Sequence, residues 1–169
     1  TALATNAVLR IEEALRATSD LAVPDDMLAV VLKALLAHGA TWDTAAAELL
    51  QALAVDNGYL EWRHQRTEIS RFLGLGHPDI ARVLGNTRQR ALALGWGSLE
   101  AGKAAPFHVP LPRTLSGKNE ARGLTVTVAW LTPTHFRHNA YRHAVLDLSL
   151  RGLGKDATLH VHAGCDHAF

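Results

Sequence analysis

The stretch VLKALLAHGA, residues 31–40, decides how the first half of this chain folds. Together with the residues just before it, it places apolar side chains at the i, i+3, i+4, i+7 spacing that lines one face of a helix: Leu28, Val31, Leu32 and Leu35. Pro24 and the acids at 25 and 26 are typical of a first helical turn. His38 and Gly39 are typical of a last turn and a C-cap. The stretch therefore predicts the end of a largely buried helix.

Helical patterns continue on both sides of this stretch. Before it, TALATNAVLRIEEAL predicts a helix whose face is formed by residues at spacings of four, three and four: Ala4, Val8, Ile11 and Leu15. After it, we expect Asp43 to cap a third helix that runs to about Leu53, and DNG at 56–58 to form a turn. The segment 59–74 is mixed, and it predicts a helix with some loop character, with Trp62, Ile69 and Leu73 on a common face.

The segment GLGHPDIARVLG, residues 74–85, combines two glycines, a proline and an aspartate ahead of a short helix that Gly85 ends. It is not a phosphate-binding loop, because it lacks the G-x-G-x-x-G register, a preceding strand and a following lysine. We expect a tight turn that needs a positive φ or a close backbone approach.

The period of the pattern changes to two after about residue 87. LTVTVAW, residues 124–130, alternates apolar and threonine side chains and predicts a half-buried antiparallel strand. Similar alternation predicts strands at 146–150 and 159–161, and at 107–111, where the prolines at 106, 110 and 112 favour an edge strand. The expected fold class is α+β, with a helical region at 1–86 and an antiparallel β domain of sandwich or jelly-roll type at 87–169.

The bulk composition is that of a water-soluble globular chain. It has 169 residues, 48% of them hydrophobic and 20% charged, with a formal charge of +1. This charge argues against a strong nucleic-acid or membrane-surface partner, and no apolar run is long enough for a membrane span. The single cysteine, Cys165, cannot form an internal disulfide and favours a reducing compartment, so we expect the cytoplasm.

Ten histidines are the first candidates for chemistry. The tail HVHAGCDH offers three imidazoles and a thiolate that suit a tetrahedral zinc site: His160, His162, Cys165 and His167. Their spacing matches no common zinc module, and surface histidines are the simpler interpretation, so we expect neither a metal nor another cofactor. The segment HFRHNAYRH, residues 135–143, carries His135, His138 and His143, and it predicts a loop without a defined site. No nucleophile motif such as G-x-S-x-G occurs, and Cys165 is a poor nucleophile candidate.

Several motifs, in order, resemble subtilisin-like serine peptidases, in particular a bacterial branch with a C-terminal β domain. TALATNAVLRIEEAL resembles the helix that follows the serine motif G-T-S-x-A, and LKALLAHGATW resembles the next helix of that branch. RFLGLGHPDIARVLG resembles the closing G-x-G-x-P-D turn and short helix. LGWGSL, FHVPLPRTLSG and GLTVTVAWLTPTHFRHNAYRHAVLDLSL resemble the following β domain. The resemblance covers most of 1–42, 71–97 and 106–150, and it is lost at 43–70 and from Arg151 onward.

The resemblance implies that this chain is the part of a serine endopeptidase that follows the catalytic serine, which would lie about three residues before Thr1. The aspartate, the histidine base and the oxyanion asparagine would lie further upstream, so no residue of this chain is expected to be catalytic. The implied partners are the N-terminal part of the same peptidase and a polypeptide substrate. Residues 2–15 would support the serine, because a nucleophile at a helix N-terminus benefits from the positive end of the helix dipole.

One alternative stays open from the residues alone. A β-sandwich with a loop rich in histidine and arginine at 135–143 would suit a non-catalytic module that binds a protein or an anionic ligand. Arg137 and Arg142 would provide the positive charge. The helical first half counts against this interpretation, because such a module does not need it.

Overall fold

A computed structural model describes residues 2–18, 21–57, 62–85, 90–109, 124–134, 144–151 and 157–165. The chain mixes helices with a small antiparallel sheet, and it divides into two compact units, Thr1–Ala91 and Leu92–Phe169. Within the described residues, no helix has both the length and the apolar character needed to cross a membrane.

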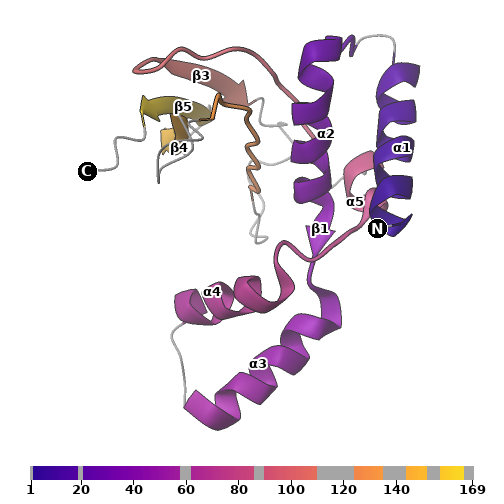
Figure 1. Cartoon of the computed structure of the whole chain (residues 1–169), viewed down its shortest axis with the longest axis vertical. Helices are drawn as coiled ribbons and strands as arrows, with labels where there is room; N and C mark the ends of the chain where they lie inside the picture. The colour runs from indigo at the N-terminus through magenta and orange to yellow at the C-terminus, as the bar shows by residue number, and fades with distance from the viewer. Residues whose placement is uncertain are drawn as a thin grey trace, which may run out of the picture. The chain divides into compact units, whose positions relative to one another are not determined.

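The first unit has a core of three helices (Figure 1): α1 (Ala2–Ala17), α2 (Asp25–Gly39) and α5 (Ile80–Leu84). Each of the three contacts the other two. Their buried apolar side chains are Ala7, Ile11, Val31, Leu32, Leu35 and Val83. Ile11 is 1% exposed and is the largest fully buried side chain among the described residues. The stretch 31–40 therefore supplies half of this core, as its spacing predicts.

Local signals account for the ends of these helices. Pro24 is the N-cap of α2, and Asp25 and Asp26 in its first turn are favourable near the positive end of the helix dipole. At the end of α1, the Thr18 hydroxyl donates to the Ala14 carbonyl over 2.9 Å. Asp79 caps α5, with its Oδ1 accepting from the Ala81 N–H at 3.0 Å. Gly85 is the C-cap of α5, which confirms the expected end of the short helix.

The buried face of α1 differs slightly from the expected one. Ile11 is buried, and Val8 and Leu15 are half-buried, but Ala4 is exposed. Ala7 is fully buried in its place. A helix turns by about 100° per residue, so Ala7 and Ile11, four residues apart, lie on the same face. A small side chain at position 7 allows a close helix approach there, which a count of large apolar residues overlooks.

Gly39 has a different role from the predicted one. It is the last residue of α2, and the C-cap is Ala40 in an extended conformation. The reason for a glycine is the packing of α5 and the preceding turn: a Cβ added at position 39 would lie 2.6 Å from Val83 Cγ2 and 2.8 Å from the Asp79 carbonyl oxygen. Gly39 is buried, and its carbonyl accepts from the Asp79 N–H at 3.0 Å. Close approach, not a left-handed cap, explains this residue.

Two further helices form a hairpin, which we call the arm: α3 (Asp43–Asn57) and α4 (Trp62–Leu73). Among the described elements, α3 and α4 contact chiefly each other. In Figure 1 the chain leaves the three-helix core after β1 (Ala40–Thr41) and returns to α5 after α4. The returning segment contains β2 (His77–Pro78). β1 and β2 pair antiparallel, with Ala40 opposite Pro78 and Thr41 opposite His77. Within the segment 59–74 the expected helix is confirmed over 62–73, and α3 extends beyond its expected end at Leu53, as far as Asn57.

The second unit contains a three-stranded antiparallel sheet in the order β3–β5–β4. Its strands are β3 (Ala104–Val109), β4 (Ala144–Arg151) and β5 (Ala157–Cys165). Phe107 pairs with Leu159, and Leu148 pairs with Val161. β3 lies at an edge of the sheet, as the proline at 106 predicts, because proline has no N–H to donate to a second neighbour.

The predicted strand at 124–130 is wrong. Residues 124–133 form neither helix nor strand, and Leu124 and Val126 are exposed, while Val128 and Trp130 are half-buried. The Trp130 indole N–H donates to the Ala144 carbonyl of β4 over 3.3 Å, which is a side-chain contact and not a strand pairing. An alternating pattern indicates which side of a segment is buried. A strand forms only where a neighbouring strand supplies backbone hydrogen bonds. In the described residues, β3, β5 and β4 pair among themselves instead.

Candidate functional site at the base of the arm

A group of polar contacts lies where the arm joins the core. We call this region the neck and define it as residues 41–43 and 74–77. Its central group is the Asp43 carboxylate, which accepts from the Thr41 hydroxyl at 2.9 Å through Oδ1. The other oxygen of the carboxylate, Oδ2, lies 3.0 Å from His77 Nε2. Asp43 was expected to cap α3, but its carboxylate instead joins the two strands of the neck.

The backbone of the neck is left-handed at three positions. Asp43 has a φ of 42°, Gly74 a φ of 59° and Gly76 a φ of 94°. Aspartate is one of the few non-glycine residues that adopt this conformation readily, because its short side chain can form local hydrogen bonds. The expected turn with positive φ at 74–76 is therefore confirmed. The third left-handed residue, Asp43, lies on the other connection of the arm, and nothing in the local sequence indicates its conformation.

The two glycines differ in what surrounds them. A Cβ added at Gly76 would overlap the Thr41 carbonyl, with its oxygen 2.2 Å away, and would lie 2.8 Å from Trp42 Cδ1. A Cβ added at Gly74 would meet nothing within 4 Å. Gly76 is thus needed for both close approach and backbone conformation, whereas Gly74 is needed for conformation alone.

Trp42 connects the neck to α4. Its indole N–H donates to the Gly74 carbonyl over 3.0 Å. The Arg66 guanidinium of α4 lies 6.0 Å from the centre of the Trp42 ring, at the outer limit of a cation–π contact. An exposed contact of this kind contributes about 0.5–1 kcal/mol, which is similar to what an exposed hydrogen bond or ion pair contributes.

The chemistry available at the neck is limited by the order of its groups. In a serine-type triad, the imidazole lies between the hydroxyl and the carboxylate, so that it can take the hydroxyl proton. Here the carboxylate of Asp43 lies between the hydroxyl of Thr41 and the imidazole of His77. The Thr41 proton points to a carboxylate, which does not activate it as a nucleophile. The side chains of Asp43 and His77 are also about half exposed, at 55% and 51%, so water competes for both.

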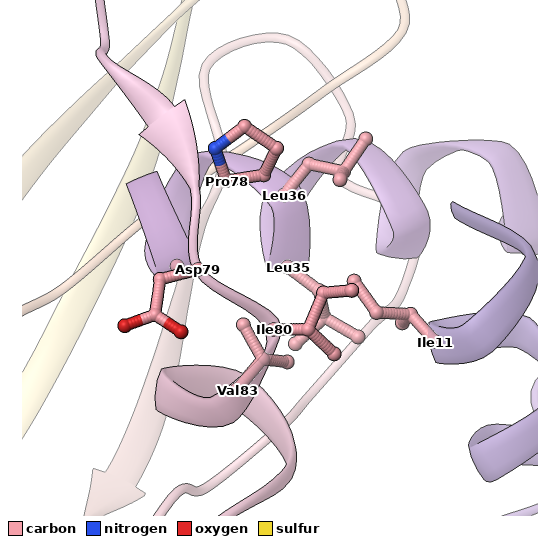
Figure 2. Close-up of a pocket in the computed structure, with 8 residues that line it drawn as sticks. Ile11, Leu35, Leu36, Pro78, Asp79, Ile80 and Val83 are labelled. Carbon is pink, nitrogen blue, oxygen red and sulfur yellow. The ribbon is translucent and has the colours of Figure 1, made fainter. Parts of the chain in front are cut away.

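The described residues also form a shallow apolar depression, on the three-helix core. Figure 2 shows Ile11, Leu35 and Ile80 pointing toward one another, with Val83 beside them, while the Asp79 carboxylate points away. Leu36, Gly39 and Pro78 complete the lining. The depression has no room for a water molecule, so it is part of the packed core and not a ligand site.

The surroundings of one described histidine, His38 in α2, alter its pKa. Burial lowers the pKa of the His38 imidazole below its usual value of 6.5, and the nearby positive charges of Arg82 and Arg90 lower it further. Burial disfavours the charged imidazolium, and the two guanidinium groups repel it. His38 therefore favours the neutral form, at the end of the helix that the sequence pattern identifies as the most buried.

Most of the sequence-based site candidates lie outside what the structure describes. The strand β5 includes the backbone of His160, His162 and Cys165, with His160 opposite Pro106 and Ser149, but their side chains are not described, and His167 lies outside the described residues. Where side chains are described, no three histidine, cysteine or acidic residues form a metal-binding group. The four weak zinc candidates therefore lie outside the described side chains, and the expectation of no metal stays a prediction. The loop 135–143 also lies outside the described residues.

Sequence reasoning missed the contact between Asp43 and His77. Both residues lie next to recognised signals, a helix start and a glycine turn, but the pairing depends on the two-residue ladder that brings Thr41 opposite His77. No local pattern predicts a ladder this short. The usable signal is the glycine at position 76, because a glycine that needs a close backbone approach implies a neighbouring segment.

Comparisons of the chain with models of protein families, with curated proteins and with solved structures gave no match. Function must therefore be argued from the residues and their geometry.

Proposed function

We propose that this chain is a segment of a subtilisin-like serine endopeptidase, in which the first unit supports a catalytic serine supplied by the preceding part of the polypeptide. The complete enzyme would cleave peptide bonds by acyl-enzyme chemistry with a Ser-His-Asp triad. In this proposal the segment carries no catalytic residue. Its partners are the N-terminal part of the same peptidase and a polypeptide substrate.

The observation that carries the proposal is how the resembling segments pack. Three stretches that resemble the peptidases, 1–15, 32–42 and 71–85, contribute α1, α2 and α5, and these helices share one core. Ile11, Leu35 and Val83 come from one of these helices each, and all are at most 5% exposed. The stretch that departs from the resemblance, 43–70, forms all of the described arm except the end of α4, residues 71–73. The division by resemblance and the division by packing therefore agree to within three residues.

The packing also suits the proposed role. A nucleophile must be held within about 1 Å of its productive position, since a larger error can cost about a hundredfold in rate. A helix buried on two neighbours provides such support, because it cannot shift without disturbing both. α1 contacts α2 and α5, and Ile11 is almost fully buried between them.

We further propose that the sheet β3–β5–β4 belongs to an antiparallel β-sandwich or jelly-roll domain that covers or regulates the peptidase core. The antiparallel order and the edge position of β3 support this. The single cysteine supports a reducing compartment, and we propose the cytoplasm.

A fluorophosphonate probe, which labels activated serines, tests the proposal. The 169-residue chain alone should not be labelled, whereas the parent polypeptide should be labelled at the serine of its G-T-S-x-A motif. The control is the parent polypeptide with that serine replaced by alanine, which should not react. Labelling of the segment alone would contradict the assignment of the active site to the preceding part. A parent polypeptide that lacks the motif, or that carries it and is not labelled, would contradict the peptidase assignment.

A further inference from the structure

We infer that the neck is a hinge, about which the α3–α4 arm turns as one body relative to the three-helix core, and that the Thr41–Asp43–His77 contacts hold it in the position described. This inference goes beyond the proposed function and does not depend on it. It concerns a conformational device, and it holds or fails whether or not the parent polypeptide is a peptidase.

The arm has few residues in its connections to the core. The arm is connected to the core through two strands of two residues each, Ala40–Thr41 and His77–Pro78. Its helices contact chiefly each other among the described elements, and Ile69 of α4 is only 3% exposed, so the arm has a buried residue of its own. A body with internal packing and two short connections moves more easily as a whole than it deforms.

The backbone of the neck also suits a hinge. Hinges place large changes of φ and ψ in a few residues at the ends of elements. Asp43 begins α3, and Gly74 directly follows α4, so there is one left-handed residue on each of the two connections where it meets the arm. Gly74 has open space around its Cα, which leaves room for a change of conformation. Gly76 has none, because Thr41 and Trp42 fill the space, so the core side of the return connection is fixed.

The contacts described across the hinge are polar and exposed. The Asp43 carboxylate binds the Thr41 hydroxyl and lies within 3.0 Å of His77 Nε2, and the Trp42 indole N–H donates to the Gly74 carbonyl. Exposed polar contacts each contribute little and open readily in water. The left-handed backbone of Asp43 costs free energy that its side-chain contacts offset. Removing the carboxylate therefore removes the contacts and leaves the strain.

Spin-label distance measurements on the full chain test the hinge. Labels are attached to cysteines placed at Ala29 in α2 and Ala47 in α3, both of which are exposed, in a Cys165→Ser background. We expect one narrow distance distribution with the native neck, and a distribution about twice as wide in Asp43→Ala, because the arm then samples several positions. His77→Ala should widen the distribution less, since it leaves the Thr41 contact in place.

A matched control separates the hinge from a general loss of charge pairing. Glu68→Gln breaks an ion pair with Arg71 that lies within α4 and does not cross the neck, so the distribution should stay narrow. A broad distribution with the native neck would overturn the inference, because the contacts would then not hold the arm. Equal widths in Asp43→Ala and Glu68→Gln would also overturn it. If Asp43→Ala fails to fold, Thr41→Val removes the hydroxyl contact alone and should widen the distribution by less, and an unchanged width there would overturn the inference.

Discussion

Gly39→Ala is the sharpest test of the core geometry, because the structure gives the two atoms that an added methyl group would meet. The new Cβ would lie 2.6 Å from Val83 Cγ2 and 2.8 Å from the Asp79 carbonyl oxygen. Both distances are well below ordinary van der Waals contact, which is about 3.5–4.0 Å between carbon atoms. Overpacking of a buried site lowers the free energy of unfolding by about 1–3 kcal/mol. The higher helix propensity of alanine than of glycine raises it by up to about 1 kcal/mol. We expect Gly39→Ala to lower the free energy of unfolding by about 1–2 kcal/mol, measured by urea denaturation.

The double mutant with Val83→Ala tells which contact is responsible. Val83→Ala removes two methyl groups from a residue that is 5% exposed, which costs about 2 kcal/mol by itself. It also removes the Cγ2 atom that the new methyl group would meet. Gly39→Ala should therefore cost less in the Val83→Ala background than in the native chain, although the contact with the Asp79 carbonyl remains. A stabilising effect of Gly39→Ala in the native chain would refute the close approach, and equal costs in both backgrounds would refute the role of Val83.

Two other predictions follow from the same unit. Ile11→Ala should lower the free energy of unfolding by about 2–5 kcal/mol in the same assay, because it leaves a cavity at a position that is 1% exposed; a loss below about 1 kcal/mol would contradict the burial of α1. Since burial and the two arginines lower the pKa of His38, the unfolded chain binds more protons than the folded one, and stability should fall as the pH drops below 6.5. His38→Gln should weaken this dependence, measured as urea unfolding between pH 5 and pH 7.5; an unchanged slope would contradict it.

The helices could be predicted because their causes are local. Apolar spacing, Pro24 and Asp79 at helix starts and Gly85 at a helix end all act within a few residues, and each prediction from them is confirmed in type and approximate extent. The edge position of β3 was also predictable, since a proline limits pairing whatever the rest of the sheet does.

Features that depend on a distant partner could not be predicted in this way. Gly39 looks like a C-cap by position, but Val83 and the Asp79 backbone determine its role. Asp43 looks like a helix cap, but its carboxylate binds across the neck. The segment 124–130 has the alternation of a strand and pairs with none of β3, β4 and β5. In each case the local pattern is present in the sequence, but a contact with a distant residue determines the structural role of the segment.

The geometry of the neck explains how a helical hairpin can lie between segments that form one core. Thr41 and His77 face each other across an antiparallel ladder, so the two ends of the arm are already adjacent. The entropy cost of closing a chain segment grows only slowly with its length, which means that a long insertion at such a point costs little more than a short turn. The attachment of the arm therefore depends on the close packing beside the ladder, where Gly76 leaves no room for a side chain against Thr41. Substitutions at exposed arm positions and in the core around Ile11 share no partner, so their effects on the free energy of unfolding should add. Substitutions at Gly76 should instead affect the attachment of the arm.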